Sequence, residues 1–216
     1  MMNTLRLSIA VAVVACSAGC GNVERSRDLA NPEVSGVTLA RQVCSNCHGS
    51  GGSAVSPNFP NLAGQSRIYL AAQLHGFKSQ DRRDPAGFEY MFGLSRRLTD
   101  AQIDALADYY AGQQLVRQPV EGDERSILTG KAVFVNGIPA RGVPPCTACH
   151  GSGGMGEGAN PRLAGQHADY VRKQLDVFQR TPEARPEGSA MKIVAHGLDG
   201  SDIAGLAAYV QSLPER

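Results

Sequence analysis

The sequence carries one nine-residue pattern twice, CSNCHGSGG at residues 44–52 and CTACHGSGG at residues 146–154. Each copy begins with the pentapeptide Cys-x-x-Cys-His, and both copies end in the identical hexapeptide CHGSGG. The offset of 102 residues is too long for the unit of a solenoid, whose repeats are some 20–45 residues long. A chain of 216 residues has room for two domains of about 100 residues each. The repeated stretch therefore predicts an internal duplication.

The similarity between the two halves continues beyond this stretch. The tetrapeptide Leu-Ala-Gly-Gln occurs at residues 62–65 and again at residues 163–166, an offset of 101. Further identical pairs recur at offsets of 101 or 100: Tyr69 and Tyr170, Gln73 and Gln174, Leu74 and Leu175, Phe77 and Phe178, Met91 and Met191, Leu98 and Leu198, Ile103 and Ile203, Leu106 and Leu206, and Tyr109 and Tyr209. The drift of two residues fits small loop deletions, so we interpret the chain as two homologous domains.

Helical periodicity predicts the secondary structure of both halves. Apolar residues at helical spacing and helix-start signals place helices at residues 36–44, 65–79, 129–135 and 166–180. Thr99 and Gln102 form a capping-box pattern that opens the last helix of the first half, and Asp199 opens its counterpart. Gly36 and Gly130 are expected to permit close crossing of the first and last helices. Because no alternating strand pattern of useful length occurs, the expected fold is all-α.

The first twenty residues resemble an export signal. Arg6 is followed by a mostly apolar run at residues 7–15, too short to span a bilayer, which takes roughly 20 residues. Cys16 and Cys20 each follow small residues, and either fits the lipobox at which bacterial lipoproteins are cut and acylated. Ordinary signal cleavage near Ala18 is the alternative. We expect export to the periplasm, and a lipidated Cys would tether the chain to a membrane.

Both Cys-x-x-Cys-His pentapeptides have the spacing of a c-type haem attachment site. Two residues between the thiols set the sulfurs apart by the separation of the two haem vinyl carbons, and the next residue is carried beneath the iron. We therefore expect two covalently bound haem c groups, with Cys44, Cys47, Cys146 and Cys149 forming thioethers and His48 and His150 binding the iron. Two haems would also fill cores that are short of aromatic residues, since the chain has no Trp and only 6 Phe and 6 Tyr.

Other uses of these cysteines fit less well. A zinc ribbon places its Cys-x-x-Cys pairs some 15–20 residues apart, and a thioredoxin-like dithiol needs a strand–helix–strand context. Disulfides are common in exported proteins but do not explain the adjacent His in both copies. A non-haem binding module would be colourless. The 21 Lys and Arg nearly balance the 20 Asp and Glu, so there is no basic surplus for binding nucleic acid.

Symmetry between the halves selects the candidates for the second axial ligand. Met91 and Met191 lie 43 and 41 residues after their histidines, each shortly before the last helix of its half. Met155 has no counterpart and follows His150 by only five residues. The other histidines, His75, His167 and His196, also lack a histidine at the equivalent position. We expect Met91 and Met191 to bind the irons, since His/Met ligation suits electron transfer.

Two further sets of residues accompany these candidates. Pro60 and Pro161 follow the histidines by 12 and 11 residues, and their carbonyl groups are candidates to accept the imidazole N–H and fix its tautomer. Alternatively, each proline only ends a loop before a helix. Tyr69, Tyr170, Tyr109 and Tyr209 are interpreted as half-buried core residues with a solvated hydroxyl. The alternatives are contact with the haem propionates or a meeting at the domain interface.

Together these motifs resemble the cytochrome c4 family of dihaem class I c-type cytochromes. The resemblance covers roughly residues 36–213 and includes the paired P-x-L-A-G-Q segments and the ending L-T-D-x-x-I-x-x-L-A-x-Y-Y at residues 98–110. It implies two tandem class I cytochrome c domains related by a pseudo-twofold axis. The expected division is residues 1–20 as signal peptide, 21–35 as N-terminal tether, 36–116 as cytochrome c domain 1, 117–125 as linker and 126–216 as cytochrome c domain 2.

The resemblance also implies a function. Members of the family carry electrons in the periplasm, typically from a quinol-oxidising cytochrome complex toward a terminal oxidase. We therefore expect an electron-transfer protein rather than an enzyme, with those complexes as its redox partners. The alternative is a cytochrome subunit or dihaem enzyme of sulfur-compound or peroxide metabolism. An enzyme would need an open iron site, against which a Met in each half argues.

Overall fold

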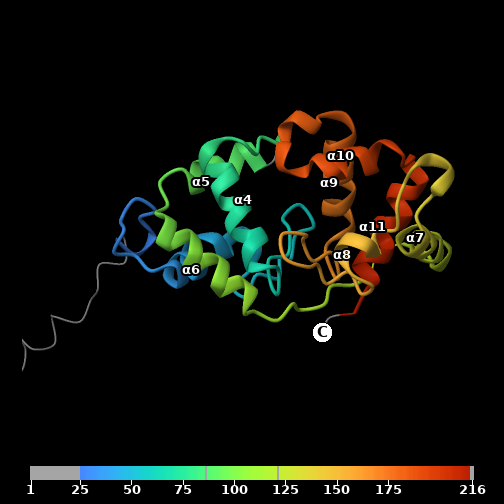
Figure 1. Ribbon diagram of the computed structural model, residues 1–216. Coiled ribbons are helices and arrows are strands. Elements are labelled where there is room, and N and C mark those ends of the chain that lie inside the picture. Colours follow the sequence, from blue (N-terminus) through green and yellow to red (C-terminus); the bar gives the residue numbers. More distant parts are fainter. Residues whose placement is uncertain (1–24, 86, 121, 215–216) are drawn as a thin grey trace, which may run out of the picture.

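A computed structural model describes residues 25–85, 87–120 and 122–214 of the chain (Figure 1). Within these residues the regular structure is helical, and the only β-type pairings are two isolated bridges, Ile138 with Val143 and Glu157 with Asn160. The all-α prediction is confirmed. The predicted signal peptide, with Cys16 and Cys20, lies outside the described residues. None of the helices described is long and apolar enough to cross a membrane.

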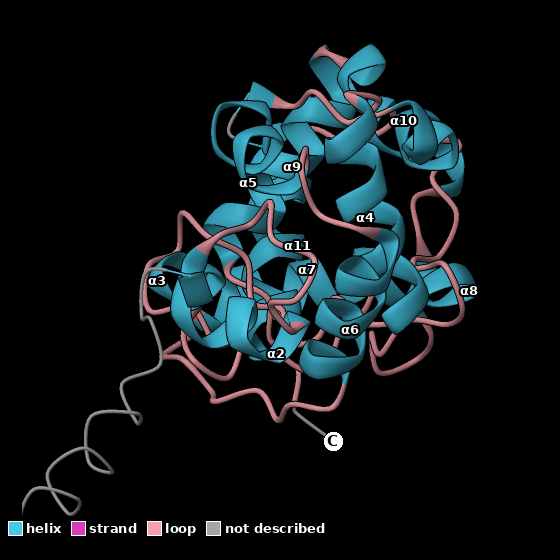
Figure 2. Ribbon diagram, turned by 90° about the vertical axis from the view of Figure 1, so that its left-hand side faces the viewer, coloured by secondary structure: helices cyan, strands magenta, loops and turns pink. Residues whose placement is uncertain are grey.

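The two halves form two lobes that lie side by side (Figure 1). The first half contains η2 (Arg25–Arg27), α2 (Gly36–Leu39), η3 (Ala40–Cys44), α3 (Ser45–His48), α4 (Arg67–Ser79), η4 (Gly87–Phe92), α5 (Gly93–Ser95) and α6 (Asp100–Ala111). The second contains α7 (Glu124–Asn136), η5 (Pro139–Arg141), α8 (Thr147–His150), α9 (Ala168–Arg180), η6 (Pro182–Ala184), η7 (Pro186–Gly188), α10 (Ser189–His196) and α11 (Gly200–Ser212). Figure 2, which views the molecule from a second direction, shows helices joined by loops throughout the described residues.

Side-chain caps determine where the long helices begin. The Thr99 hydroxyl accepts the Gln102 N–H in a capping box at the start of α6, and Asp199 makes the equivalent box at the start of α11. Both helix starts were predicted. The helix α7 begins at Glu124, inside the predicted linker and five residues before the predicted helix, because the Asp123 carboxylate caps it by accepting the Ser126 N–H at 2.7 Å.

Glycines allow the first and last helices of each half to cross closely. A Cβ on Gly36 would lie 2.6 Å from the Ala105 Cβ of α6. A Cβ on Gly130 would overlap the backbone of Gly205 in α11. The predicted role of Gly36 and Gly130 is therefore confirmed, and in each half the crossing brings the opening helix onto the closing one.

Each half has its own apolar core. The core of the first half gathers residues of α2, α4 and α6, with Leu39, Leu70, Ile103 and Leu106 among its buried members. The core of the second half gathers residues of α7, α9 and α11, with Phe134, Leu175, Ile203 and Leu206 among its buried members. Full burial of one such side chain is worth about 1.5–3 kcal/mol, so each half has a source of stability of its own.

Reciprocal hydrogen bonds from the repeated Leu-Ala-Gly-Gln segments join the halves. The Gln65 side chain donates to the Arg162 carbonyl at 2.9 Å and accepts the Arg162 N–H at 2.7 Å. The Gln166 side chain makes the same pair of bonds to the Asn61 backbone, at 2.9 and 2.8 Å. Because equivalent residues make equivalent bonds in the two directions, the halves are related by an approximate twofold axis.

Candidate functional site

A sharp turn after each Cys-x-x-Cys-His segment directs its histidine inward. The short helix α3 ends at His48 and is followed by Gly49 at φ +75°, while α8 ends at His150 and is followed by Gly151 at φ +77°. Residues that carry a side chain rarely adopt a positive φ, so glycine is required at this turn. As a result both histidines are buried, at 7% and 6% exposure.

The two histidines make the same hydrogen bond. The His48 Nδ1 lies 2.9 Å from the Pro60 carbonyl oxygen, and the His150 Nδ1 lies 2.9 Å from that of Pro161. Because a carbonyl only accepts, Nδ1 carries the proton and Nε2 keeps its lone pair. Burial lowers the pKa of both imidazoles, which favours the neutral form that binds metals. The predicted contact with the proline carbonyls is confirmed.

The four cysteines that are expected to attach haem carry free thiols in the structure. Cys44, Cys47, Cys146 and Cys149 form no disulfide. Burial raises the pKa of the Cys44 and Cys146 thiols to about 11, so they are neutral rather than thiolate ligands. Among the described residues, no three of His, Cys, Asp and Glu gather as a metal cluster. The Cys-x-x-Cys-His spacing, with a neutral imidazole directly after the second thiol, fits a haem held by thioethers.

The two predicted methionines lie in equivalent segments before the last helix of each half. Met91 belongs to η4 and Met191 to α10, and both are half-buried. Met191 packs against the core of the second half, and Met155 does so too. The burial of these methionines thus does not separate ligand from core residue, and the assignment of Met91 and Met191 depends on the symmetry of the chain.

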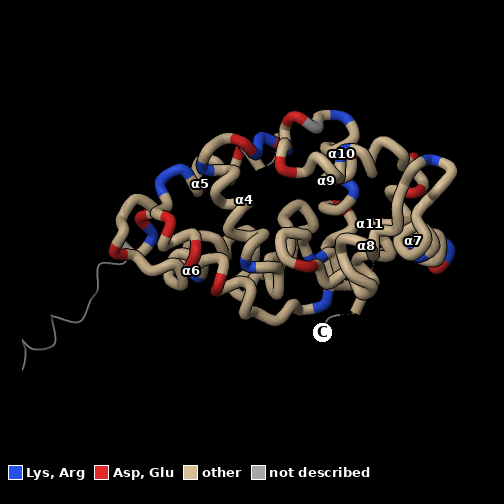
Figure 3. Tube along the Cα trace, in the orientation of Figure 1, with Lys and Arg blue, Asp and Glu red and all other residues tan. Residues whose placement is uncertain are grey.

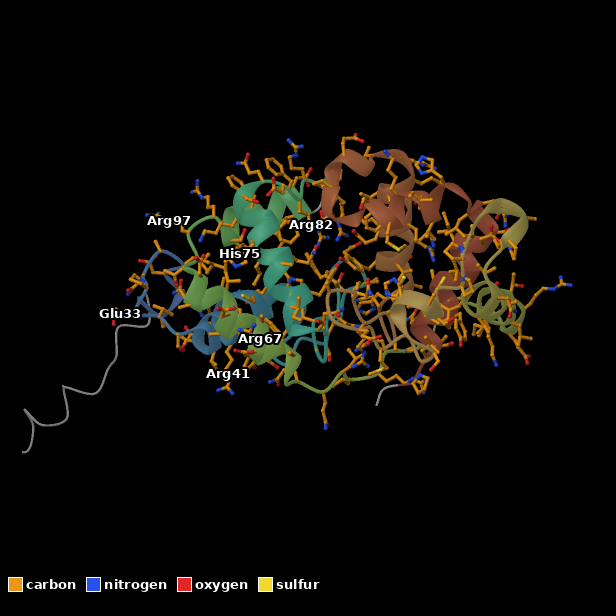
Figure 4. All side chains as sticks on the ribbon, viewed as in Figure 1. Glu33, Arg41, Arg67, His75, Arg82 and Arg97 are labelled. Carbon is orange, nitrogen blue, oxygen red and sulfur yellow. The ribbon has the colours of Figure 1, made fainter. Side chains whose placement is uncertain are left out.

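The other histidines are occupied elsewhere or exposed. His167 is buried, and its Nε2 lies 2.9 Å from the Ala54 carbonyl of the other half. The His196 Nδ1 lies 2.8 Å from the Lys192 carbonyl within its own helix. His75 is exposed on α4 (Figure 4). These contacts agree with the symmetry argument, which assigned none of them to an iron.

The surroundings of the two histidines differ in aromatic content. In the first half the Phe59 ring contacts His48 edge-on, with centroids 6.1 Å apart, and meets the Tyr90 ring at 6.3 Å. The equivalent positions in the second half are Asn160 and Ala190, at the offsets of 101 and 100. The two sites are therefore not chemically identical, although their histidines make the same bond.

Sequence reasoning missed two arginines at the junction of the lobes. Arg82 and Arg185 are buried there, and each donates to a tyrosine of the other half, Arg82 to Tyr170 and Arg185 to Tyr69. The interpretation of Tyr69 and Tyr170 as core residues with a solvated hydroxyl is therefore wrong, because their hydroxyls contact the other half as the interface alternative had it. A repeated pattern of Arg followed two residues later by an acid, at residues 82–84 and 185–187, was the available signal.

Acidic and basic residues are interspersed along both lobes (Figure 3). No large region of one sign is visible in that view, in keeping with the near balance of 21 basic and 20 acidic residues. Charge therefore gives no strong preference for one half as the surface that meets a partner.

Comparisons with known proteins agree with this geometry. The Cytochrome c family model matches residues 34–112 and again residues 127–214. Cytochrome c4 of Pseudomonas aeruginosa is 37% identical over 79% of this chain and 84% of its own length. The crystal structure of reduced recombinant cytochrome c4 from Pseudomonas stutzeri superposes with a TM-score of 0.73, at 33% identity over 85% of this chain and 99% of that chain.

A further relative has a more specific name. A thiosulfate dehydrogenase electron acceptor of Stutzerimonas stutzeri is 29% identical over 84% of this chain and 83% of its own length. The twofold match to the Cytochrome c family accounts for the duplication, and the cytochrome c4 relatives account for nearly the whole described chain. The chain therefore belongs to the cytochrome c4 family of dihaem c-type electron-transfer cytochromes and carries two covalently bound haem c groups.

Proposed function

We propose that the chain is a periplasmic electron carrier with two His/Met-ligated haems. In this proposal the first haem is attached through Cys44 and Cys47 and ligated by His48 and Met91, and the second is attached through Cys146 and Cys149 and ligated by His150 and Met191. Cys16 or Cys20 would carry the lipid of a membrane tether. The proposal makes the chain a carrier and not an enzyme, because both irons would be closed by protein ligands.

The observation that carries the proposal is the identical hydrogen bond of the two histidines, at 2.9 Å in each half. Bound haem supplies one-electron exchange between ferric and ferrous iron. The backbone carbonyl of Pro60 or Pro161 accepts a hydrogen bond from each imidazole, which fixes its orientation and raises its basicity as a ligand.

We further propose that the carrier takes electrons from a quinol-oxidising cytochrome complex and delivers them to a terminal oxidase. Support comes from the similarity to cytochromes c4 along most of the chain. The junction between the lobes would let an electron enter through one half and leave through the other. The near balance of acidic and basic residues in the chain suits repeated, short-lived encounters with more than one partner.

A second candidate function is that of electron acceptor for a thiosulfate dehydrogenase. It is favoured by the similarity to a protein of that name, which extends over 84% of this chain. Both candidates need the same closed, His/Met-ligated haems. They differ only in the protein that reduces the chain.

The ligand set is tested by absorption spectra of the purified, dithionite-reduced protein before and after addition of carbon monoxide. We expect sharp low-spin c-type bands from two haems that the gas leaves unchanged. A spectral change in about half of the haem would mean one open iron, and the carrier proposal would give way to an enzyme.

The partner is tested by mixing the oxidised protein with two reductants in separate stopped-flow experiments. One is a quinol-oxidising cytochrome complex with its quinol, and the other is a thiosulfate dehydrogenase with thiosulfate. Faster reduction by the first supports the respiratory carrier. Faster reduction by the second, at equal concentrations and ionic strength, would replace it with the acceptor role.

A further inference from the structure

A buried arginine lies on each side of the junction between the lobes. Arg82, in the loop after α4, is placed where the first half meets the second (Figure 4). Its guanidinium donates to the Asp84 carboxylate at 2.6 Å and to the Gln73 side chain at 2.6 Å within its own half. It reaches across the junction to the Tyr170 hydroxyl at 3.3 Å and the Gln174 side chain at 3.5 Å.

Arg185 makes the contacts that the approximate twofold axis relates to those of Arg82. It donates to Glu187 at 2.8 Å and to Gln174 within its own half. Across the junction it donates to the Tyr69 hydroxyl at 3.4 Å and to the Gln73 side chain at 2.9 Å. Each glutamine oxygen therefore accepts from both arginines, and neither arginine is satisfied by its own half alone. The shared acceptors bind the two lobes into one hydrogen-bond network.

The network is costly to bury, which argues that it serves more than packing. Arg82 and Arg185 are only 5% and 3% exposed, although their guanidinium groups carry like charges and share acceptors. Buried ion pairs are often replaceable by apolar residues without loss of stability, because removing charge from water is expensive. Duplicated halves that need only adhere could do so with apolar side chains.

Each arginine also packs over an aromatic ring that contacts the start of a methionine-bearing segment. The Arg82 guanidinium lies over the Phe77 ring at 4.4 Å, and a Cβ on Gly87, the first residue of η4, would lie 2.6 Å from that ring. In the second half Arg185 lies over the Phe178 ring at 4.9 Å, and Gly188, which precedes α10, meets the same ring. The segments η4 and α10 carry Met91 and Met191.

We propose that Arg82 and Arg185 are positioning residues that couple the two methionine-bearing segments across the domain junction. Loss of one arginine then alters the position of the methionine side chain in both halves. A change in the ligand position at one iron is transmitted to the other through the glutamines that both arginines share. The inference rests on the proposed ligation of the irons by Met91 and Met191. Neither arginine touches the reacting iron; each acts through the aromatic ring beneath it.

The test is proton NMR of the dithionite-reduced holoprotein. The haem ring current shifts the methyl signal of an iron-bound methionine far upfield, so one such signal is expected for each half. Met91→Ala and Met191→Ala assign the two signals by their loss. In Arg82→Gln and in Arg185→Gln we expect both methyl signals to shift, and both midpoint potentials to change in a redox titration. A shift confined to the half that carries the substitution would overturn the proposal.

Three variants separate coupling from general damage. Arg83→Gln, an exposed neighbour of Arg82, should leave both signals in place. Arg82→Lys keeps the charge but replaces the planar fork with one compact ammonium group, which cannot reach the acceptors of Arg82 in both halves together. Its signals should therefore move as they do in Arg82→Gln. Recovery of both wild-type signals in the Lys variant would contradict positioning by the forked guanidinium and favour a purely electrostatic effect.

A milder variant serves if Arg82→Gln does not fold. Gln174→Met keeps a side chain of similar length but removes the shared acceptor that the second half offers to Arg82 across the junction. The signal that matters is then that of Met91, which lies in the other half, and an unchanged Met91 methyl would overturn the inference. Failure of the ligand proposal is distinct, because the wild-type protein itself would then lack one or both upfield methyl signals.

Discussion

Single residues set the chemical state of the two candidate iron sites. The carbonyls of Pro60 and Pro161 fix the tautomer of the histidines, and burial keeps the imidazoles neutral. The sulfur ligands are defined less directly, since three methionines of the described chain are half-buried and two of them pack on the same core. Substitution of each methionine in turn therefore tests the assignment.

We expect Met91→Leu and Met191→Leu each to open one iron to carbon monoxide. Leucine keeps the volume at a cost usually below about 1.5 kcal/mol but offers no sulfur. The reduced spectrum should then change with the gas in about half of the haem, and in all of it in the double variant. Met155→Leu is the matched control and should remain unresponsive; a carbon monoxide response in that variant would reassign the ligand of the second half.

The helix cap Asp199 links stability to pH. Hydrogen bonds from the Ser201 hydroxyl and from the Asp202 and Ser201 N–H groups lower the pKa of its carboxyl well below the usual value. A lowered folded-state pKa stabilises the protein above the unfolded pKa of about 3.9, and this stability is lost as the pH falls through the lowered folded-state value.

We therefore expect Asp199→Asn to lose stability at neutral pH and to show a weaker dependence on pH in acid. Urea unfolding followed by circular dichroism at about pH 7 and about pH 3 measures both effects. Glu89→Gln, an exposed carboxyl of the first half, is the control and should unfold like the wild type at each pH. If acidification lowered the free energy of unfolding of the wild type and of Asp199→Asn by the same amount, the assigned role of the cap would be contradicted.

At the scale of elements, the crossing of the first and last helices determines the shape of each half. Helices α7 and α11 approach so closely that Gly130 faces the backbone of Gly205. Van der Waals contact of two backbones excludes even a methyl group, so the crossing depends on glycine more than on any apolar side chain. The first half also has a close crossing, but there Gly36 faces the methyl group of Ala105 instead of a second glycine.

We expect Gly130→Ala to destabilise the second half by about 1–3 kcal/mol, because the added methyl group forces α7 away from α11. Gly200→Ala is the matched control: it lies at the start of α11, where a Cβ would meet nothing within 4 Å. That variant should stay within about 1 kcal/mol of the wild type. Denaturant unfolding measures the free energy of unfolding of both variants. Equal values for Gly130→Ala and Gly200→Ala would contradict the close crossing of α7 and α11.

At the scale of the whole molecule, paired polar contacts hold two self-sufficient lobes in one orientation. Gln65 and Gln166 each bridge to a backbone of the opposite half, and the arginine network extends the junction. Since each lobe has its own core, the junction determines whether they unfold together. In the proposed carrier, electron transfer from one half to the other would depend on the same orientation, because it would set the separation of the two irons.

We expect Gln65→Ala to weaken the coupling between the lobes. The change removes both hydrogen bonds to the Arg162 backbone, at a cost of about 1–3 kcal/mol for a buried polar group left without them. Calorimetry of the holoprotein should show one thermal transition in the wild type and separate or broadened transitions in the variant. Gln114→Ala, an exposed residue, is the control; a single unchanged transition in Gln65→Ala would count against the junction as described.

Much of the fold could be predicted from the chain alone because the signals are local. The capping boxes at Thr99 and Asp199, and the spacing of the Cys-x-x-Cys-His segments, depend on residues that lie within a few positions of one another. The earlier start of α7 was missed because one capping residue, Asp123, stands in a stretch whose Pro and Gly content is typical of a linker. A single side-chain bond outweighed the composition of its surroundings.

The sequence by itself determined the duplication, the helical class, the haem-attachment segments and the candidate ligands, because each is written as a short pattern and then written again. Only the tertiary structure decided how the halves meet. Arg82 and Tyr170 are 88 residues apart along the chain, and no local periodicity relates an arginine in one loop to a tyrosine on a helix of the other half. Such pairs form only when the two folded halves dock. Because docking removes water from the charged groups, those groups need hydrogen-bond partners from the other half.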